Sequence, residues 1–194
     1  MSAVSSVKSL SMRKSKEQTP KTNGHLFKLD IACGNNKQKG FKGIDIIGKG
    51  TQADIVHDLN KFPWPFEANS VDEIFCSHYI EHVPDLMAFM NEIGRILKVG
   101  SRVMFIAPYY TSIRAWQDPT HVRAISEASF LYYGKEWRKI NRLEHYPINC
   151  NFKIESINYA FDTEWRDKSA DAIQYAMKHF WNVASDIQVI LRKL

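Results

Sequence analysis

The sequence predicts an α/β fold built on a mostly parallel sheet, with helices on both faces and an antiparallel hairpin at its C-terminal end. Three observations support this prediction. Short apolar segments alternate with turn residues from residue 26 onward, an amphipathic helix separates two of them, and polar residues stand where several of them end. A chain of 194 residues, 44% of them hydrophobic, is long enough for a globular domain with an ordinary core.

Five strands and one helix are expected in the first half of the chain. The helix is expected over residues 84–99, where apolar residues recur at intervals of three and four, with Pro84 in the first turn and Gly100 after the end. In a parallel sheet, ligands bind beyond the carboxyl ends of the strands, so polar residues at strand ends mark the expected ligand edge. The expected strands cover residues 26–32, 43–46, 53–57, 71–77 and 102–107.

The second half of the chain is less regular. Residues 126–141 are predicted to be helical, with a serine N-cap, and residues 170–184 carry an apolar face at helical spacing. Residues 152–161 and 187–191 read as strands, and a strand, an insertion and a strand predict a hairpin that closes the sheet. Because no internal repeat is present, residues 26–194 are predicted to form a single domain.

The net charge of +5 is confined to the N-terminal part of the chain. Beyond residue 28, basic and acidic side chains are equal in number. Residues 1–25 are predicted to be a disordered basic tail, which is either a solubilising extension or a segment that binds polyanions. They lack the apolar core of a signal peptide, and no apolar run of the chain approaches the ~20 residues that span a bilayer.

The cysteine pattern indicates a reducing compartment. Cys33, Cys76 and Cys150 are widely spaced and odd in number, which argues against a disulfide framework. The paired C-x-x-C spacing of a structural zinc site is absent from the sequence. We therefore expect a cytoplasmic protein.

A turn that is suited to a nucleotide-like ligand follows the first expected strand. The segment from Leu29 to Asn35 ends in Gly34, and a glycine at a strand tip lets the backbone approach a ligand closely. Asp45 ends the second expected strand, where a carboxylate can accept hydrogen bonds from a ribose diol. Each half alone is also compatible with an ordinary tight turn and an exposed aspartate.

Five ordered stretches resemble the class I S-adenosylmethionine-dependent methyltransferases, which have a Rossmann-like fold. Residues 29–45 are similar to motif I, and residues 53–59, 62–74, 78–83 and 97–101 resemble later conserved stretches of the family. The resemblance implies S-adenosylmethionine as the cofactor, with its ribose on one strand-end aspartate and its methyl sulfonium near the glycine turn. The implied cofactor-binding residues are Asp30, Ala32, Cys33, Gly34, Asn35, Asp45, Ile46, Asp58, Leu59, Ser77 and His78.

The chain departs from the family pattern in two ways. Asn35 or Asn36 replaces the usual second glycine of motif I, and asparagine also tolerates a left-handed backbone. Only residues 34–40 separate the first two expected strands, whereas a parallel crossover normally takes a dozen residues or more. We therefore expect an abbreviated loop in place of the usual first helix.

A rival pattern is His78-x-x-Glu81-His82, which matches an inverted zinc-peptidase motif. That motif needs a sustained helix, and Pro84 disfavours helix at the residue before it. We therefore expect no metal, and a packed His82 is the plainer interpretation.

The acceptor is expected to bind at residues 108–123, which follow the fifth strand. His121 lies on an Asp-Pro-Thr-His turn and is the first candidate for a general base, with His82 the second. A turn-stabilising role for His121 stays open. The candidate substrate-binding residues are Tyr109, Tyr110, Trp116 and Arg123.

These observations predict a methyltransferase that acts on a small molecule or a sugar-type hydroxyl or amine. A cofactor-binding module without chemistry and a nucleic-acid modifier that uses the basic tail are the alternatives. The charge-balanced body argues against nucleic acid, and no membrane attachment is expected. The oligomeric state stays open.

Overall fold

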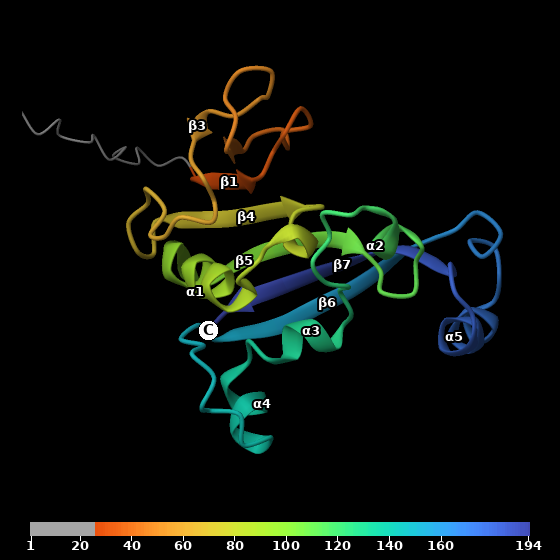
Figure 1. Cartoon of the computed structure of the whole chain (residues 1–194). Helices are drawn as coiled ribbons and strands as arrows, with labels where there is room; N and C mark the ends of the chain where they lie inside the picture. Colours follow the sequence, from red (N-terminus) through yellow and green to blue (C-terminus); the bar gives the residue numbers. More distant parts are fainter. Residues whose placement is uncertain (1–25) are drawn as a thin grey trace, which may run out of the picture.

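The computed structural model describes residues 26–194, and residues 1–25, which include the predicted basic tail, lie outside the described residues. A seven-stranded sheet forms the centre of the molecule, with the strand order β3-β2-β1-β4-β5-β7-β6 (Figure 1). The strands are β1 (Lys28–Ile31), β2 (Lys42–Asp45), β3 (Ile55–Val56), β4 (Val71–Ser77), β5 (Leu97–Pro108), β6 (Phe152–Phe161) and β7 (Ala184–Lys193).

The strand directions confirm the predicted fold class. Strands β3, β2, β1, β4 and β5 run parallel to one another. Strand β7 pairs antiparallel with both β5 and β6. The C-terminal hairpin therefore closes a mostly parallel sheet. Its register shifts twice along the outer strand β6, at Ile154/Ser156 and at Ala160/Phe161.

Six short helical segments accompany the sheet. The longest, α1, begins after Asp85, whose carboxylate accepts a hydrogen bond from the backbone N–H of Ala88. None of the helices in residues 26–194 is long and apolar enough to cross a bilayer. The helical segments are η1 (Ile80–His82), α1 (Leu86–Ile96), α2 (Arg114–Gln117), α3 (Ala128–Leu131), α4 (Lys135–Ile140) and α5 (Ala170–His179).

The predicted helix over residues 126–141 is wrong, because the chain forms two separate helices there. Gly134 adopts an extended conformation and is the N-cap of α4, and Glu127, rather than Ser126, is the N-cap of α3. The buried Arg138 guanidinium donates to the carbonyl oxygens of Tyr132 and Cys150. These tertiary hydrogen bonds tie α4 to the end of α3 and to the segment that precedes β6.

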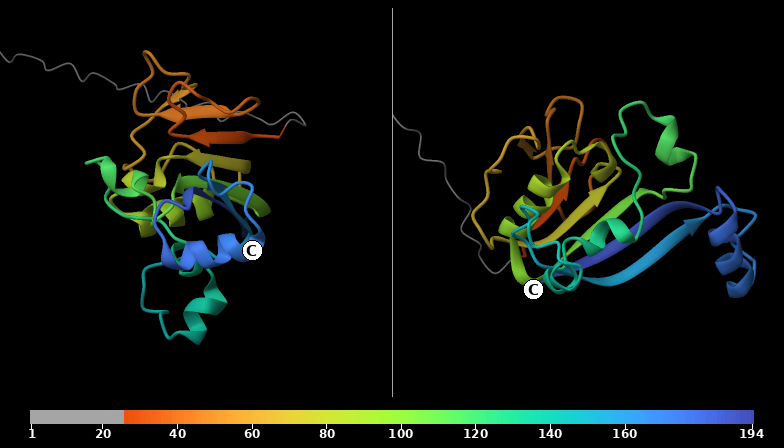
Figure 2. Two further views of the ribbon diagram at one scale, coloured as in Figure 1. Left: turned by 90° about the vertical axis from the view of Figure 1, so that its right-hand side faces the viewer. Right: turned by 60° about the horizontal axis from the view of Figure 1, so that its bottom comes forward.

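The predicted helix over residues 170–184 ends at His179, five residues early. Phe180 is extended, and Asn182 has a left-handed backbone with φ of 59°. The Asn182 side-chain oxygen accepts a hydrogen bond from the backbone N–H of Ile113 at 2.7 Å, which ties this turn to the loop after β5. Helix α5 lies beyond the ends of β6 and β7, away from α1 (Figure 2).

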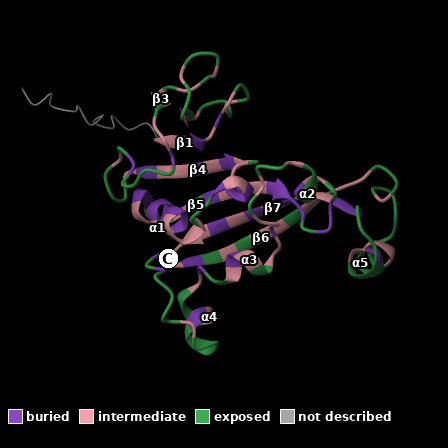
Figure 3. Cartoon of the chain, in the orientation of Figure 1, coloured by how far each residue is buried: buried purple, intermediate pink, exposed green. Residues whose placement is uncertain are grey.

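Helix α1 covers one face of the central strands, and buried residues are frequent along α1, β5 and β7 (Figure 3). Phe89 is fully buried at this contact, with ring centroids 5.6 Å from Trp64, 5.8 Å from Tyr79 and 6.5 Å from Phe105. Contacts of this kind bury large apolar area and dominate core energetics. The backbone of α1 is thereby fixed against β5.

The opposite face carries an ionic row across neighbouring strands. Lys28 of β1 pairs in register with Glu73 of β4, which pairs with Arg102 of β5.

No helix joins β1 to β2 in the described chain, so the predicted abbreviated loop is confirmed. Phe41 from this loop packs edge-on against Phe75 with ring centroids 6.3 Å apart, and so covers part of this face.

Candidate active site

The candidate site lies at the edge of the sheet where β1, β2, β4 and β5 end. Because these four strands are parallel, their carboxyl ends lie at the same edge of the sheet. This edge carries the turn after β1, Asp45 of β2, the residues after β4 and the loop after β5. Figure 1 shows the loop with α2 at this edge, beyond the ends of β4 and β5.

Two left-handed residues shape the turn after β1. Ala32 has φ of 54° and Gly34 has φ of 49°. Asn35 and Asn36, which could tolerate a left-handed backbone, do not have a positive φ. The backbone N–H of Ala32 donates to the carbonyl of Ile44 at 2.9 Å, which fixes the turn against β2. A Cβ at Gly34 would meet no atom within 4 Å, so space lies open above the turn.

Ala32→Gly is expected to raise the free energy of unfolding by about 0.5–1 kcal/mol, because glycine adopts φ of 54° without the steric cost that alanine bears. Urea denaturation measures the change. Ala53→Gly is the matched control, since Ala53 has no positive φ and its substitution should lower stability. Equal destabilisation by both variants would show that Ala32 is unstrained.

Asp45 connects the turn to the second strand. One carboxylate oxygen accepts from the N–H of Gly34 at 2.9 Å, and the other accepts from the N–H of Ile46 at 2.7 Å. A carboxylate has about four acceptor positions, so Asp45 retains capacity for a ligand hydroxyl. Ile46 and Ile47 beside it are each 57% exposed and offer an apolar surface next to that carboxylate.

Asp30 and Cys33 lie beneath the turn. Asp30 is buried, and one of its oxygens accepts from the N–H of Gln38 at 2.6 Å, which holds the abbreviated loop. Burial raises the pKa of the Asp30 carboxyl, and burial with the nearby carboxylates raises the pKa of the Cys33 thiol to about 11. A Cβ at Gly43 would lie 2.5 Å from Cys33 Sγ, so glycine is required at this strand position.

Asp58 and Leu59 follow β3. Asp58 accepts from the N–H of Asn60 at 3.1 Å, and this hydrogen bond lowers the pKa of its carboxyl. The Leu59 side chain lies in the core, and its carbonyl accepts a hydrogen bond from Trp64 Nε1 at 3.1 Å. The Leu59 side chain is therefore buried away from a ligand, whereas the Asp58 carboxylate is partly exposed.

The segment after β4 is strained at its first residue. Ser77 ends β4, and His78 has φ of 52°, a left-handed conformation that is uncommon outside glycine. The N–H of His78 donates to the carbonyl of Ile106 at 2.8 Å. Strained backbone of this kind clusters at functional sites. His78 Nδ1 lies 3.5 Å from Glu81 Oε1.

Glu81, His82 and His121 lie close together and form an acid–histidine cluster. Glu81 is 2% exposed, and neither of its carboxylate oxygens has a hydrogen-bond partner among the described residues. His121 Nε2 lies 4.0 Å from Glu81 Oε1, and the rings of His82 and His121 are 4.7 Å apart. The structure therefore brings together the two histidines that were expected to be catalytic.

The loop after β5 uses two of the predicted substrate-binding residues for its own structure. The Tyr109 hydroxyl is buried and donates to Glu127 Oε1 at 2.9 Å. Burial raises the pKa of this hydroxyl, which keeps it a donor. The Arg123 guanidinium donates to the carbonyl oxygens of Val83 and Pro84, so it fixes the segment after η1.

The other two predicted substrate-binding residues stay accessible. Trp116 is 58% exposed, and its Nε1 donates to the Tyr110 carbonyl at 3.0 Å. Tyr110 is also exposed. The two aromatic side chains therefore offer a surface in the same loop as His121.

Sequence reasoning missed Glu81 as a site residue. It stands in the His78-x-x-Glu81-His82 pattern, but the segment forms a single 3-10 turn rather than a sustained helix. The second histidine that approaches Glu81 comes from residue 121, forty positions away. The signal that could have identified Glu81 as a site residue is its position between His78 and His82 in the sequence.

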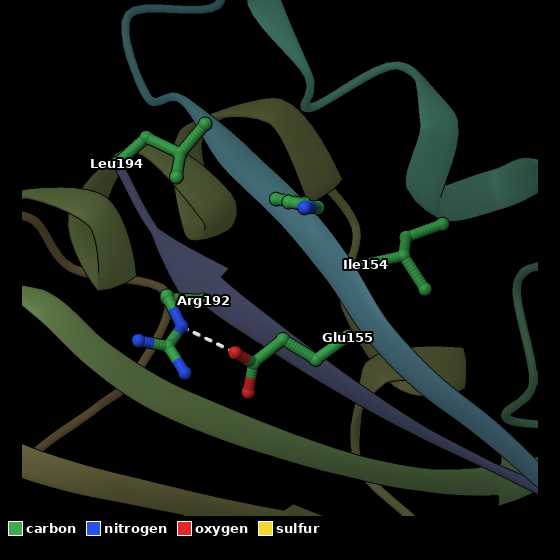
Figure 4. Close-up of a pocket in the computed structure, with 5 residues that line it drawn as sticks. Ile154, Glu155, Arg192 and Leu194 are labelled. Carbon is green, nitrogen blue, oxygen red and sulfur yellow. Dashed lines mark hydrogen bonds and ion pairs between the residues drawn. The ribbon is translucent and has the colours of Figure 1, made fainter.

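A hollow of 480 Å³ lies elsewhere on the molecule, at the opposite end of the sheet (Figure 4). It is lined by Lys153, Ile154, Glu155, Arg192 and Leu194, and Glu155 pairs with Arg192 across it. Arg192 is in register with Arg102 near the start of β5, far from the carboxyl strand ends. This hollow is therefore not part of the candidate site.

Comparison with known proteins supports the resemblance seen in the sequence. Residues 29–105 match the family model of the methyltransferase domain, whereas no curated protein matches the chain. The fold is similar to that of a SAM-dependent methyltransferase from Archaeoglobus fulgidus, with 19% identity, a TM-score of 0.59 and coverage of 88% of this chain and 87% of that chain.

Two further solved structures share the fold. One is an S-adenosylmethionine-dependent methyltransferase from Mesorhizobium loti, with 14% identity, a TM-score of 0.52 and coverage of 87% of this chain and 91% of that chain. The other is geranyl diphosphate C-methyltransferase from Streptomyces coelicolor A3(2) in complex with Mg²⁺, geranyl diphosphate and S-adenosyl-L-homocysteine. It shows 15% identity, a TM-score of 0.53 and coverage of 87% of this chain and 72% of that chain.

The family match includes the turn after β1, Asp45, and two members of the acid–histidine cluster, Glu81 and His82. The open space above Gly34 and the free acceptor positions of Asp45 fit an adenosine cofactor. Residues 29–105 therefore resemble a methyltransferase domain, and the chain shares its fold with S-adenosylmethionine-dependent methyltransferases.

Proposed function

We propose that the protein methylates a hydroxyl group of a small molecule, with a sugar-type hydroxyl as the model acceptor. The observation that carries this proposal is the approach of His121 Nε2 to the buried Glu81 carboxylate at 4.0 Å. A hydroxyl must lose a proton when it gains a methyl group, whereas an amine needs only to be bound uncharged. A cluster of proton-accepting groups at the acceptor position therefore favours a hydroxyl.

The cofactor-binding role is proposed for the residues at the first strand ends. Asp45 would bind the ribose through its unused acceptor positions, and the exposed Ile46 would contact one face of the adenine, with Asp58 at its edge. The turn from Ala32 to Asn35 would let the backbone approach the methionine end of the cofactor. Ser77 and His78 would contact the same end from β4.

The acceptor site is proposed beside the acid–histidine cluster. Tyr110 and Trp116 would hold the acceptor against their rings, and His121 Nε2 would take the proton from its hydroxyl. When bound, the cofactor supplies an electrophilic methyl group, whose carbon–sulfur bond breaks with its electron pair going to sulfur. The residues of this chain then have to position the hydroxyl and remove its proton, and positioning supplies much of the rate in such displacements.

The cofactor-binding part of this proposal is tested by calorimetry with S-adenosylhomocysteine. Asp45→Ala is expected to weaken binding by about 1.5–3 kcal/mol, because the carboxylate accepts charge-assisted hydrogen bonds. Asp45→Asn, which keeps the shape, separates loss of charge from disturbance of the turn. A matched control is Asp167→Ala, which changes an exposed aspartate and should leave affinity unchanged.

Two results would contradict this part. Absence of heat with folded wild-type protein would remove the cofactor site, and unchanged affinity of both Asp45 variants would place the ribose elsewhere. The acceptor class is then tested by a screen of sugars, other hydroxyl compounds and amines, followed by release of S-adenosylhomocysteine. Turnover only with amines would overturn the hydroxyl proposal.

A further inference from the structure

We propose that the acid–histidine cluster of Glu81, His82 and His121 binds a divalent transition-metal ion such as Zn²⁺. This inference rests on the proposed function in one respect, because the open coordination positions of the ion would hold the acceptor oxygen. The placement of the three side chains carries the metal site itself.

The first observation is the buried charge of Glu81. Its carboxylate is 2% exposed, and both oxygens lack a hydrogen-bond partner among the described residues. An unpaired buried carboxylate costs several kcal/mol, so such groups are paired or coordinate metals. His78 Nδ1, at 3.5 Å from Oε1, is too far for a good hydrogen bond. The carboxylate therefore needs a cationic partner.

The second observation is the orientation of His121. Its Nδ1 lies 3.1 Å from the carbonyl oxygen of Ala115, which can only accept a hydrogen bond. Nδ1 therefore carries the proton, and the lone pair of the neutral ring is on Nε2. That atom lies 4.0 Å from Glu81 Oε1 and also 4.0 Å from Asp118 Oδ2. A backbone carbonyl on the far nitrogen is the usual arrangement of a metal-bound histidine.

The orientation of His82 follows from a hydrogen-bond chain through Thr120. The Thr120 hydroxyl donates to Asp118 Oδ1 at 2.6 Å, and its oxygen lies 3.0 Å from His82 Nδ1. Because the hydroxyl proton is directed at Asp118, Thr120 Oγ1 accepts from His82 Nδ1. The lone pair of His82 is therefore on Nε2 as well. Asp118, Thr120 and His82 form the outer support that metal ligands generally have.

The cluster thus brings a carboxylate and two imidazoles, each with a lone pair available, close to one another. One ligand atom from each of Glu81, His82 and His121 lies within 4.8 Å of the other two. Ligand atoms around one Zn²⁺, each at about 2.0–2.2 Å, lie at most about 4.4 Å apart. Small rotations of the side chains would therefore close the cluster around an ion.

The donor set selects the class of ion. Two imidazoles and one carboxylate suit Zn²⁺ or Fe²⁺, whereas Mg²⁺ and Ca²⁺ prefer oxygen ligands alone. Three protein ligands leave at least one position open, as in catalytic zinc sites. An acceptor hydroxyl bound there would release its proton more readily, and that proton would leave to solvent; with the ion bound, His121 Nε2 is a ligand and no longer the proton acceptor. The expectation from the sequence that no metal is present is therefore replaced by this proposal.

Metal binding can be tested without any acceptor. Full-length protein, stripped with a chelator and dialysed, is titrated with Zn²⁺ by calorimetry and with Co²⁺ by visible absorption. Wild type should bind one ion and show the absorption bands of Co²⁺ with nitrogen ligands. Glu81→Gln and His121→Ala should each weaken binding by more than about 100-fold, which exceeds the 10–100-fold cost of losing an outer partner.

Two further variants sharpen the comparison. Thr120→Val removes the hydroxyl that supports His82 and should weaken binding by about 10–100-fold. His145→Ala, which changes an exposed histidine in the loop after α4, should bind as wild type does. If Glu81→Gln does not fold, His82→Ala replaces it, because His82 is only half-buried.

Either of two results overturns the metal site. One is a wild-type protein that binds neither Zn²⁺ nor Co²⁺, and the other is unchanged affinity in the folded Glu81, His82 and His121 variants. Binding of S-adenosylhomocysteine is measured on the same samples. Cofactor binding without metal binding rejects the metal site alone, and metal binding without cofactor binding rejects the proposed function alone.

Discussion

His121→Ala is expected to lower turnover by about 10²–10⁴-fold, the typical contribution of a positioned proton acceptor. The affinity for S-adenosylhomocysteine should stay nearly unchanged, because His121 lies in the loop after β5, whereas the proposed ribose ligand Asp45 lies at the end of β2. Turnover is measured by S-adenosylhomocysteine release with an acceptor found in the screen. Calorimetry on the same protein measures the affinity.

His145→Ala is the matched control for turnover, because it removes an exposed imidazole outside the site. It should retain the wild-type rate. Near-full turnover of His121→Ala would mean that His121 only stabilises its turn through the hydrogen bond to Ala115. His82 or simple positioning would then have to support the reaction.

Phe89→Ala is expected to lower the free energy of unfolding by about 3–5 kcal/mol, the range for removing a buried aromatic ring. Phe89 is 0% exposed and contacts Trp64, Tyr79 and Phe105, so its loss opens a cavity that these rings cannot fill without moving. Denaturation in urea, monitored by tryptophan fluorescence and circular dichroism, measures the change.

Ile140→Ala is the control for stability, because Ile140 is 78% exposed at the end of α4. Its effect should stay within about 0.5 kcal/mol, as is usual for surface changes. A loss below about 1 kcal/mol for Phe89→Ala would contradict the packing of α1 against β5, because so small a value is typical of exposed positions.

The first half of the fold could be predicted because its signals are local. Strand β4 spans the predicted residues 71–77, and β6 spans the predicted residues 152–161. The abbreviated link between β1 and β2 followed from chain length alone, since the ten residues 32–41 are too few for a parallel crossover with a helix. The apolar spacing of α1 placed that helix to within a few residues of each end.

The second half was harder because tertiary hydrogen bonds override helix-like spacing. Gly134 and the buried Arg138 divide the predicted helix over residues 126–141. The Asn182 side chain ties the turn after α5 to the loop after β5, where the sequence predicted that the helix would continue. Propensity gives way where such contacts compete with it. The approach of His121 to Glu81 is likewise non-local, so the sequence identified the histidine but not its buried partner.

The register shifts of β6 affect the free backbone edge that this strand presents to its surroundings. Strand β6 is ten residues long and forms one end of the sheet, and a long, regular edge strand would offer its free backbone groups to a second copy. The two register shifts, which skip Glu155 of β6 and Ser185 of β7, interrupt the regular pairing of this strand, and the exposed Lys153 places charge on it. An edge that is twisted and charged in this way resists strand-to-strand aggregation.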